Sequence, residues 1–270
     1  MNKKLKSVEL FLAIGLATVV NASATQAVEV VVEETEVSNS LQLTEDIATA
    51  NLIAQGGEGG EGGEGGEGGE GGEGATEMTP GEEANADFQD QLNSSELLST
   101  LKQGGYVIYF RHAQTEQDYA DQVTADVNNC STQRTLSEYG WRQARVIEKA
   151  FEENSIPVGE VISSEYCRAW QTASIAFGEY EKNAALNFLP FEDYTNEQVE
   201  EMKNNVMPLL TAVPDSGTNT VIVGHDDIFE SATGIYPAPQ GMAYVLKPDG
   251  NGSFEMIANM LPEDWALIGN

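Results

Sequence analysis

The chain contains only two histidines, and each follows a short apolar segment. His112, with Arg111 before it, comes after segment 106–110, and His225 follows segment 220–223 with one glycine between. A neutral imidazole at the end of a strand is suited to act as a nucleophile or in proton transfer. A single histidine more often has a structural role. Two at the ends of two predicted core strands predict one shared site, because the carboxyl ends of parallel strands meet at one edge of a sheet.

Positive charge is scarce and local. All five arginines fall in one stretch of the chain: Arg111, Arg134, Arg142, Arg145 and Arg168. Arg142 and Arg145 fit the solvated face of a helix, and Arg134 fits either a substrate contact or a structural ion pair. Arg111 leaves one strand end and Arg168 closely follows another. Guanidinium groups match tetrahedral oxyanions in shape and charge, so the set predicts a pocket for a phosphoryl group.

The elements that must position these residues alternate along the chain. Runs rich in β-branched and aromatic residues predict strands over 106–110, 158–163, 220–223, 242–246 and 254–257. Helical spacing predicts helices from a cap at Ser137 to Glu153, from Tyr166 to Phe177 and from Asn196 to Ala212. This order predicts an α/β domain, a three-layer α/β/α sandwich with a mainly parallel central sheet.

Four motifs stand along this predicted domain. They are Arg-His-Ala-Gln-Thr-Glu at 111–116, Leu-Ser-x-x-Gly-x-x-Gln-Ala at 136–144, Ser-Ser-x-x-x-Arg-x-x-Gln-Thr-Ala at 163–173 and Val-Gly-His-Asp at 223–226. In this order the set resembles the histidine phosphatase (phosphoglycerate mutase-like) superfamily over roughly residues 104 to 260. One motif alone is weak evidence, whereas the ordered set is specific.

The resemblance implies a mechanism. His112 is expected to attack phosphorus and to form a phosphohistidine, which water then hydrolyses. Arg111, Arg168 and His225 are expected to bind the phosphate oxygens, with His225 as a hydrogen-bond donor to them. The two guanidinium groups disfavour imidazolium by charge repulsion, so they keep His112 in its nucleophilic neutral form.

The leaving alkoxide needs a general acid, which the family takes from one of two places. Asp226, directly after the second histidine, fits one pattern, and Glu192, with Asp193 beside it, fits the other loosely. We favour Asp226 because its backbone position ties it to the pocket. The structural alternative is that Asp226 caps a helix.

Two residues depart from the family pattern. Ala113 stands in place of the usual glycine of Arg-His-Gly, and Asp118 stands where many members have a phosphate-contacting asparagine. An anion there would repel phosphate, so we expect the loop from Gln117 to Asn129 to point away from the site. This makes mutase activity on sugar phosphates less expected than hydrolysis.

The two cysteines are Cys130 and Cys167, the second directly before Arg168. In an exported protein they are expected to form one disulfide, which would hold the Arg168 loop and contribute roughly 3 to 4 kcal/mol. Two unpaired buried thiols are the alternative. Neither cysteine has the spacing of a cysteine-nucleophile phosphatase.

Charge divides the chain into three parts. Residues 1–27 carry a net charge of +2, residues 28–90 carry 17 acidic and no basic residues, and residues 91–270 carry 26 acidic and 10 basic residues, which gives the total of −31. Three lysines, an apolar run and small residues predict a signal peptide over 1–27 and export to the periplasm or the extracellular space. The Gly-Gly-Glu repeat within 28–90 predicts a disordered acidic linker. The predicted phosphatase domain is therefore 91–270.

We expect an exported phosphohydrolase that acts on a small phosphorylated substrate. A catalytically weak or inactive phosphate-binding surface protein and a sugar-phosphate mutase are the alternatives. The acidic composition excludes nucleic acid as a general partner, and the short apolar run argues against stable membrane insertion after signal cleavage. No metal or cofactor is expected, because neither histidine has metal-ligand spacing. The sequence indicates neither the particular phosphoester nor the oligomeric state.

Overall fold

A computed structural model of the chain describes residues 78–118, 120–189 and 194–269. The predicted signal peptide, the Gly-Gly-Glu repeat and Glu192 with Asp193 lie outside these residues. Within them, six strands form one sheet: β1 (Val107–Arg111), β2 (Val158–Ser163), β3 (Glu181–Lys182), β4 (Asn219–Gly224), β5 (Ala243–Pro248) and β6 (Phe254–Met260).

The strand order is β3-β2-β4-β1-β5-β6. Strands β3, β2, β4 and β1 run parallel, and β5 and β6 continue the sheet as antiparallel neighbours. The mainly parallel sheet confirms the predicted fold class. Strands β1 and β4 are neighbours, so their carboxyl ends bring the two histidine motifs together.

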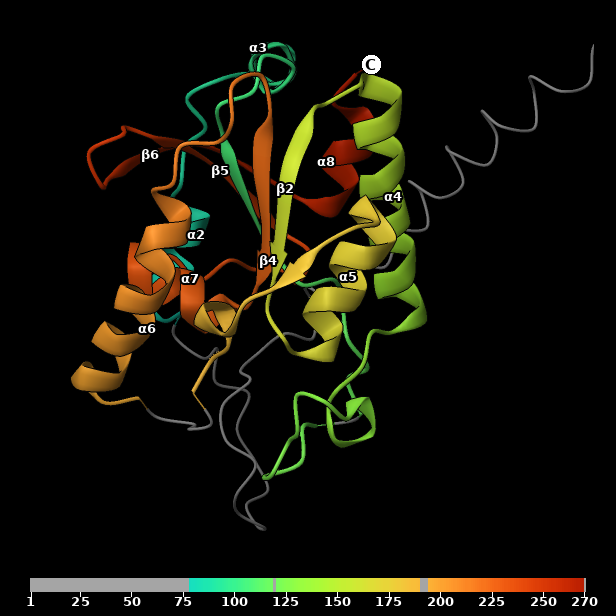
Figure 1. The fold of residues 1–270 in the computed structure, drawn as a ribbon, viewed down its shortest axis with the longest axis vertical. Coiled ribbons are helices and arrows are strands. Elements are labelled where there is room, and N and C mark those ends of the chain that lie inside the picture. Colours follow the sequence, from blue (N-terminus) through green and yellow to red (C-terminus); the bar gives the residue numbers. More distant parts are fainter. Residues whose placement is uncertain (1–77, 119, 190–193, 270) are drawn as a thin grey trace, which may run out of the picture.

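Helices cover both faces of the sheet (Figure 1). One face carries α3 (Ser94–Leu101), α4 (Glu138–Asn154), α5 (Cys167–Phe177) and α8 (Pro262–Leu267). The other carries α2 (Pro80–Ala86), α6 (Asn196–Leu210) and α7 (Asp226–Thr233). Within the described part of the chain no helix is long and apolar enough to cross a bilayer.

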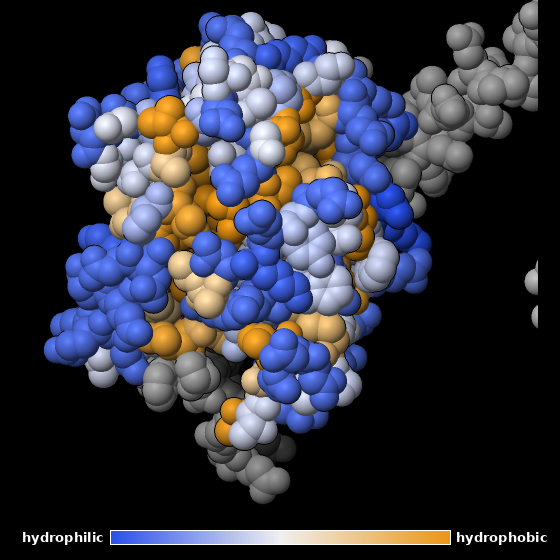
Figure 2. Space-filling model, viewed as in Figure 1, coloured by the Kyte–Doolittle hydropathy of each residue, from blue (hydrophilic) through white to orange (hydrophobic). Residues whose placement is uncertain are grey.

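The central strands are buried on both sides, which explains their nearly continuous apolar sequence. In β1, Ile108 and Phe110 belong to the core under α4 and α5, whereas Val107 and Tyr109 belong to the core under α6 and α7. Each such side chain contributes about 1.5 to 3 kcal/mol by burial. Figure 2 shows orange, hydrophobic residues along the middle of the molecule and blue, hydrophilic residues over the outer helices.

The cap predicted at Ser137 is present. Its side chain accepts a hydrogen bond of 3.0 Å from the backbone N–H of Gly140, and α4 begins at the next residue. Ala144, Ile147 and the rest of the predicted apolar stripe are buried, but Trp141, on the first turn, is 47% exposed.

The folded part begins earlier than the predicted boundary at residue 91. Helix α2 lies within the segment predicted as disordered linker, and its capping box joins Thr79 and Glu82. The helix is tied to the domain: the Asn85 amide donates to the carbonyl of Ala238 at 2.9 Å, and the backbone N–H of Tyr236 donates to the carbonyl of Gly81 at 3.0 Å. The prediction of linker for residues 80–90 is wrong because composition hid a local N-cap signal.

Candidate active site

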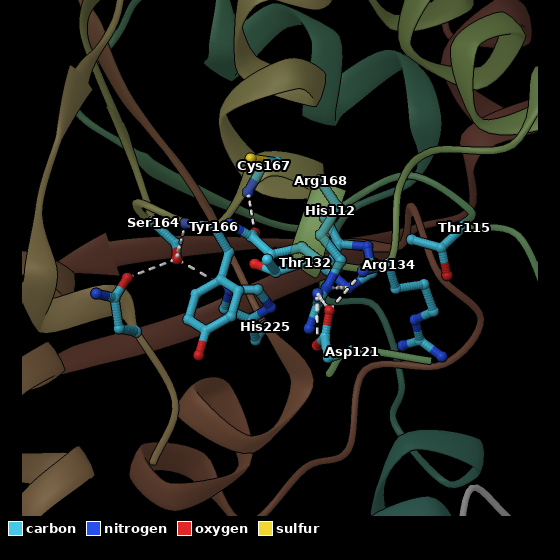
Figure 3. Close-up of polar contacts among 12 residues, drawn as sticks. His112, Thr115, Asp121, Thr132, Arg134, Ser164, Tyr166, Cys167, Arg168 and His225 are labelled. Atoms are coloured by element: carbon cyan, nitrogen blue, oxygen red, sulfur yellow. Dashed lines mark hydrogen bonds and ion pairs between the residues drawn. The ribbon is translucent and has the colours of Figure 1, made fainter. Parts of the chain in front are cut away.

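The two histidines meet at the carboxyl ends of β1 and β4, as predicted. Arg111 is the last residue of β1 and pairs in register with Gly224 of β4, so His112 and His225 leave the sheet side by side. Their ring centroids are 5.3 Å apart, and both side chains are buried. Figure 3 shows His112, His225, Arg168 and Asp121 gathered around one point, with Arg134 beside them.

The hydrogen bonds of His112 define its tautomer. Nδ1 lies 2.9 Å from the carbonyl oxygen of Ala113, which can only accept, so Nδ1 carries the proton. Nε2 lies 3.1 Å from Nε of Arg168, which can only donate, so Nε2 holds the lone pair. Burial, Arg168, His225 and Arg111 hold the pKa of His112 well below its usual value. The ring is therefore neutral, with Nε2 as its nucleophilic atom.

Arg168 is the second residue of α5 and is nearly fully buried. Its guanidinium carbon lies 5.2 Å from the ring centroids of both Tyr166 and Phe188. Its Nη1 forms an ion pair of 2.9 Å with Asp121. The guanidinium thus joins the nucleophilic nitrogen of His112 to a carboxylate of the loop before α4.

Arg111 forms the opposite side of the site. Its Nη2 pairs with the Asp226 carboxylate at 2.6 Å and donates to the Tyr236 hydroxyl at 3.3 Å, while Nη1 donates to the carbonyl of Pro237 at 3.2 Å. Asp226 is the first residue of α7. Although burial opposes ionisation, Arg111 and a hydrogen bond from Tyr236 outweigh it and lower the pKa of Asp226 to about 2. In this state Asp226 is a carboxylate.

His225 is held by contacts on both its backbone and its ring. The Tyr109 hydroxyl donates to the backbone carbonyl of His225 at 2.7 Å, and Nε2 of the ring lies 2.9 Å from Oγ of Ser164. Gly224 permits this approach, because a Cβ there would lie 2.2 Å from the Tyr109 hydroxyl oxygen. The pKa of His225 is well below its usual value through burial first and then through Arg168.

The loop from Gln117 to Asn129 does not point away from the site, so that prediction is wrong. Asp118 is exposed, but Asp121 reaches Arg168 and also accepts a hydrogen bond of 2.5 Å from the backbone N–H of Arg134. A carboxylate in this loop repels substrate phosphate, but it is equally able to satisfy the buried guanidinium of Arg168.

The predicted disulfide between Cys130 and Cys167 is present, with Cα atoms 5.6 Å apart. It joins the short helix η1 (Cys130–Thr132) to the first residue of α5. The side-chain oxygen of Gln133 also accepts from the backbone N–H of Cys167 at 2.8 Å. The bond and this contact fix the residue that precedes Arg168.

Five residues predicted to share a site lie at one edge of the sheet: His112, His225, Arg111, Arg168 and Asp226. Glu192, the alternative acid, lies outside the described residues. Asp121, Ser164 and Tyr236 also contribute to the site and were not predicted. Ser164 belongs to the motif at 163–173, but only the fold reveals its contact with His225.

In the described ranges no three His, Cys, Asp or Glu side chains are grouped so that they could hold a metal ion. The positive charge of the site comes from its arginines. The arrangement offers a neutral imidazole nucleophile beside guanidinium groups, which suits transfer of a phosphoryl group.

Residues 107–213 match the family model described as histidine phosphatase superfamily (branch 1). Among solved structures, the protein histidine phosphatase SixA complexed with tungstate is 16% identical with a TM-score of 0.44, and the match covers 59% of this chain and 98% of that one. A phosphoserine phosphatase mutant from Entamoeba histolytica in complex with phosphoserine is 14% identical with a TM-score of 0.43, and the match covers 58% and 97% of the two chains. No curated protein matches the chain.

Proposed function

We propose that this chain, which belongs to the histidine phosphatase superfamily, hydrolyses a phosphomonoester through a phosphohistidine on His112. Membership supports phosphatase or mutase activity in general. The observation that carries the finer proposal is the tautomer of His112: Nδ1–H is engaged by the carbonyl of Ala113, and the Nε2 lone pair lies beside Arg168.

The lone pair of Nε2 attacks phosphorus while the bond from phosphorus to the ester oxygen breaks, and water then attacks the phosphohistidine to release phosphate. Charge that spreads over the phosphoryl oxygens is stabilised by Arg168 and Arg111, which are buried and already oriented. Because the pKa of His112 is low, its neutral form persists well below pH 6.5. Protonation of this ring therefore does not limit activity near neutrality.

Asp226 remains the proposed donor to the leaving oxygen, with Glu192 as the alternative. In the free protein Arg111 keeps Asp226 ionised. A bound phosphoryl group shares Arg111 and adds negative charge nearby, and both effects raise the pKa of Asp226. Asp226→Asn is expected to slow hydrolysis of an alkyl phosphate far more than that of a nitrophenyl phosphate, whose leaving group needs no proton. An equal loss with both esters would move the role to Glu192, tested by Glu192→Gln.

The experiment compares full-length protein with His112→Ala on a generic aryl phosphate. His112→Ala is expected to lose at least about a thousandfold in kcat/KM, since it lacks the nucleophile. The matched control is Arg142→Ala, which removes an exposed arginine paired only with Glu138 in the described structure and should keep activity. Rapid quench in base should trap an acid-labile phosphoryl label on wild type and none on His112→Ala. Equal background turnover by wild type and His112→Ala would favour the inactive phosphate-binding alternative.

We also propose that the protein is exported to the periplasm or the extracellular space. The disulfide supports this location, because such bonds persist in oxidising compartments. Fractionation of the producing cell tests it: a processed chain outside the cytoplasm is expected, and an unprocessed cytoplasmic chain would contradict it.

A further inference from the structure

Asn187 follows the short helix η2 (Ala184–Leu186) and is held in one orientation by Glu165. The backbone N–H of Glu165 donates to Oδ1 of Asn187 at 3.0 Å, and Nδ2 of Asn187 donates to the carboxylate of Glu165 at 2.7 Å. Since an N–H cannot accept and a carboxylate cannot donate, the two bonds identify the amide oxygen and nitrogen. Oδ1 of Asn187 is therefore an acceptor only.

This acceptor determines the direction of the next hydrogen bond. Oγ of Ser164 lies 2.8 Å from Oδ1 of Asn187, so the single hydroxyl hydrogen of Ser164 points to Asn187. The lone pairs of Oγ remain for the backbone N–H of Tyr166, at 3.2 Å, and for Nε2 of His225, at 2.9 Å. Nε2 of His225 must then be the donor and carry the proton.

The protonation state of Nδ1, the other ring nitrogen of His225, follows from the proton on Nε2. With a pKa well below its usual value the ring is neutral, so Nδ1 holds the lone pair. Nδ1 is buried and has no hydrogen-bond partner among the residues that the structure describes. The ring lies between Tyr166 and the His112–Arg168 pair (Figure 3). His112 has the reverse arrangement, with its proton on Nδ1 and its lone pair on Nε2.

We propose that Asn187 is a positioning residue which, through Ser164, keeps the proton of His225 on Nε2 and so makes the site bind a phosphoryl group together with one proton. This rests on the proposed function, which puts the phosphoryl group beside both histidines. A bare lone pair at Nδ1 repels a phosphate oxygen. The contact becomes attractive when one proton lies between them, brought by the phosphate monoanion or taken up by the ring.

The charges around His225 keep its ring neutral in the free protein and favour its protonation once phosphate is bound. Arg111 from β1, Arg134 from the loop before α4 and Arg168 from α5 all disfavour imidazolium, whereas Asp226 favours it. Two further titratable rings, His112 and Tyr166, are in T-shaped contact with the His225 ring, and the Tyr109 hydroxyl donates to the His225 carbonyl. The anion of the substrate reverses this balance, because it neutralises the guanidinium groups.

The first test reads the tautomers directly by long-range proton–nitrogen NMR of the full-length protein labelled on histidine, without a histidine tag. Two histidines give two ring patterns, and the expected result is opposite neutral tautomers. Asn187→Leu and Ser164→Ala should each release His225 to the mixture of tautomers or to Nδ1–H while His112 keeps its pattern. Identical tautomers in wild type, or an unchanged His225 pattern in both variants, would overturn the proposal.

The second test counts protons by titration calorimetry with inorganic phosphate in buffers of different ionisation enthalpy. At about pH 8, above the second pKa of phosphate, wild type should take up about one proton for each phosphate bound. Uptake should fall in Asn187→Leu and Ser164→Ala, and the double variant should match the single ones because both act through one chain of hydrogen bonds. The matched control, Asn183→Ala, removes a neighbouring amide that caps η2 and should leave uptake unchanged.

The outcomes separate this inference from the proposed function. Phosphate binding without proton uptake in wild type would overturn the inference and leave hydrolysis standing. Proton uptake that persists in both variants would also overturn the inference. It would assign the proton to another group, with Asp226 as the first candidate. Proton-coupled phosphate binding without turnover or trapped phosphohistidine would support the inference and refute the proposed phosphohydrolase activity. Absence of any phosphate binding would refute both.

Discussion

The carboxylate of Asp121 contacts the same guanidinium group that a substrate phosphate needs, at 2.9 Å from Nη1 of Arg168. It therefore competes with the substrate from within the chain. Asp121→Asn is expected to lower KM for an aryl phosphate and to tighten vanadate binding by several-fold to tenfold, since about 1.4 kcal/mol corresponds to a factor of ten.

Steady-state kinetics and vanadate inhibition measure the effect of Asp121→Asn. The matched control is Asp118→Asn, which removes the same charge from an exposed position of the same loop. If both variants improve binding equally, overall charge is responsible and direct competition at Arg168 is wrong. Weaker vanadate binding in Asp121→Asn alone would show that the carboxylate orders Arg168 for its ligand.

Asp226 and Asp227 begin α7 with opposite protonation behaviour. Burial and the charge of Asp226 raise the pKa of Asp227 from 3.8 to about 7. The folded state thus binds the proton of Asp227 more tightly than the unfolded state, so this group favours folding most at low pH and loses that contribution as pH rises through about 7.

Asp227→Asn is therefore expected to raise the melting temperature by roughly 2 to 6 °C at about pH 8 and to leave it nearly unchanged at about pH 4. Thermal unfolding followed by circular dichroism over this range measures the difference. A stabilisation of equal size at both pH values would contradict the raised pKa. Part of the effect passes through Tyr194, whose hydroxyl lies 3.2 Å from Asp227.

At the scale of elements, the disulfide connects η1 to the start of α5 across a separation of 37 residues. Closing a loop of this length contributes roughly 4 kcal/mol in the chain-entropy model. The double variant Cys130→Ser, Cys167→Ser is expected to melt roughly 10 °C lower than wild type. It should also lose part of kcat/KM, because Arg168 directly follows the bridge. Retained stability after the substitution would mean that Gln133 and the core suffice to hold α5.

Periodicity and strand-end positions were enough to predict the central sheet and its main helices. The strands predicted over 106–110, 158–163 and 220–223 correspond to β1, β2 and β4 with shifts of one residue at most, because continuous apolar runs bounded by polar residues leave little choice. Helices α2, α3, α7 and α8 were not predicted. Each has eight residues or fewer, so it spans too few turns for an apolar stripe to stand out in the sequence.

The residues of the site also fall into a predictable group and an unpredictable group. Residues that leave strand ends were predictable, because topology alone brings His112 and His225 together. The contacts of Asp121 and Asn187 depend on loop conformations that no period in the sequence encodes. Tyr236 and Phe188 stand outside the four motifs, yet Tyr236 touches Arg111 and Phe188 packs against the ring of His225.

At the scale of the whole molecule, the residue at which a fragment begins affects the stability of its folded domain. A fragment 78–270 keeps α2 and the edge-to-face contact of Phe88 with Tyr244, whereas 91–270 loses both. We expect 91–270 to melt roughly 5 °C below 78–270, consistent with a loss of about 1 to 3 kcal/mol. Calorimetry of the two fragments measures this. Equal melting temperatures would mean that α2 adds nothing to the domain.

Helix α2 also touches the segment that supplies partners to Arg111. Gly81 and Asn85 bind Tyr236 and Ala238. In the same segment, Tyr236 offers Arg111 its hydroxyl and Pro237 offers its carbonyl. Proteolysis near the start of the domain would therefore have two distinct products. A protease that cuts ahead of Thr79 would release an active domain. One that cuts a dozen residues later would release a domain in which the segment that binds Arg111 has lost its contacts with α2. The position of the cut would then set the activity of the cleaved protein.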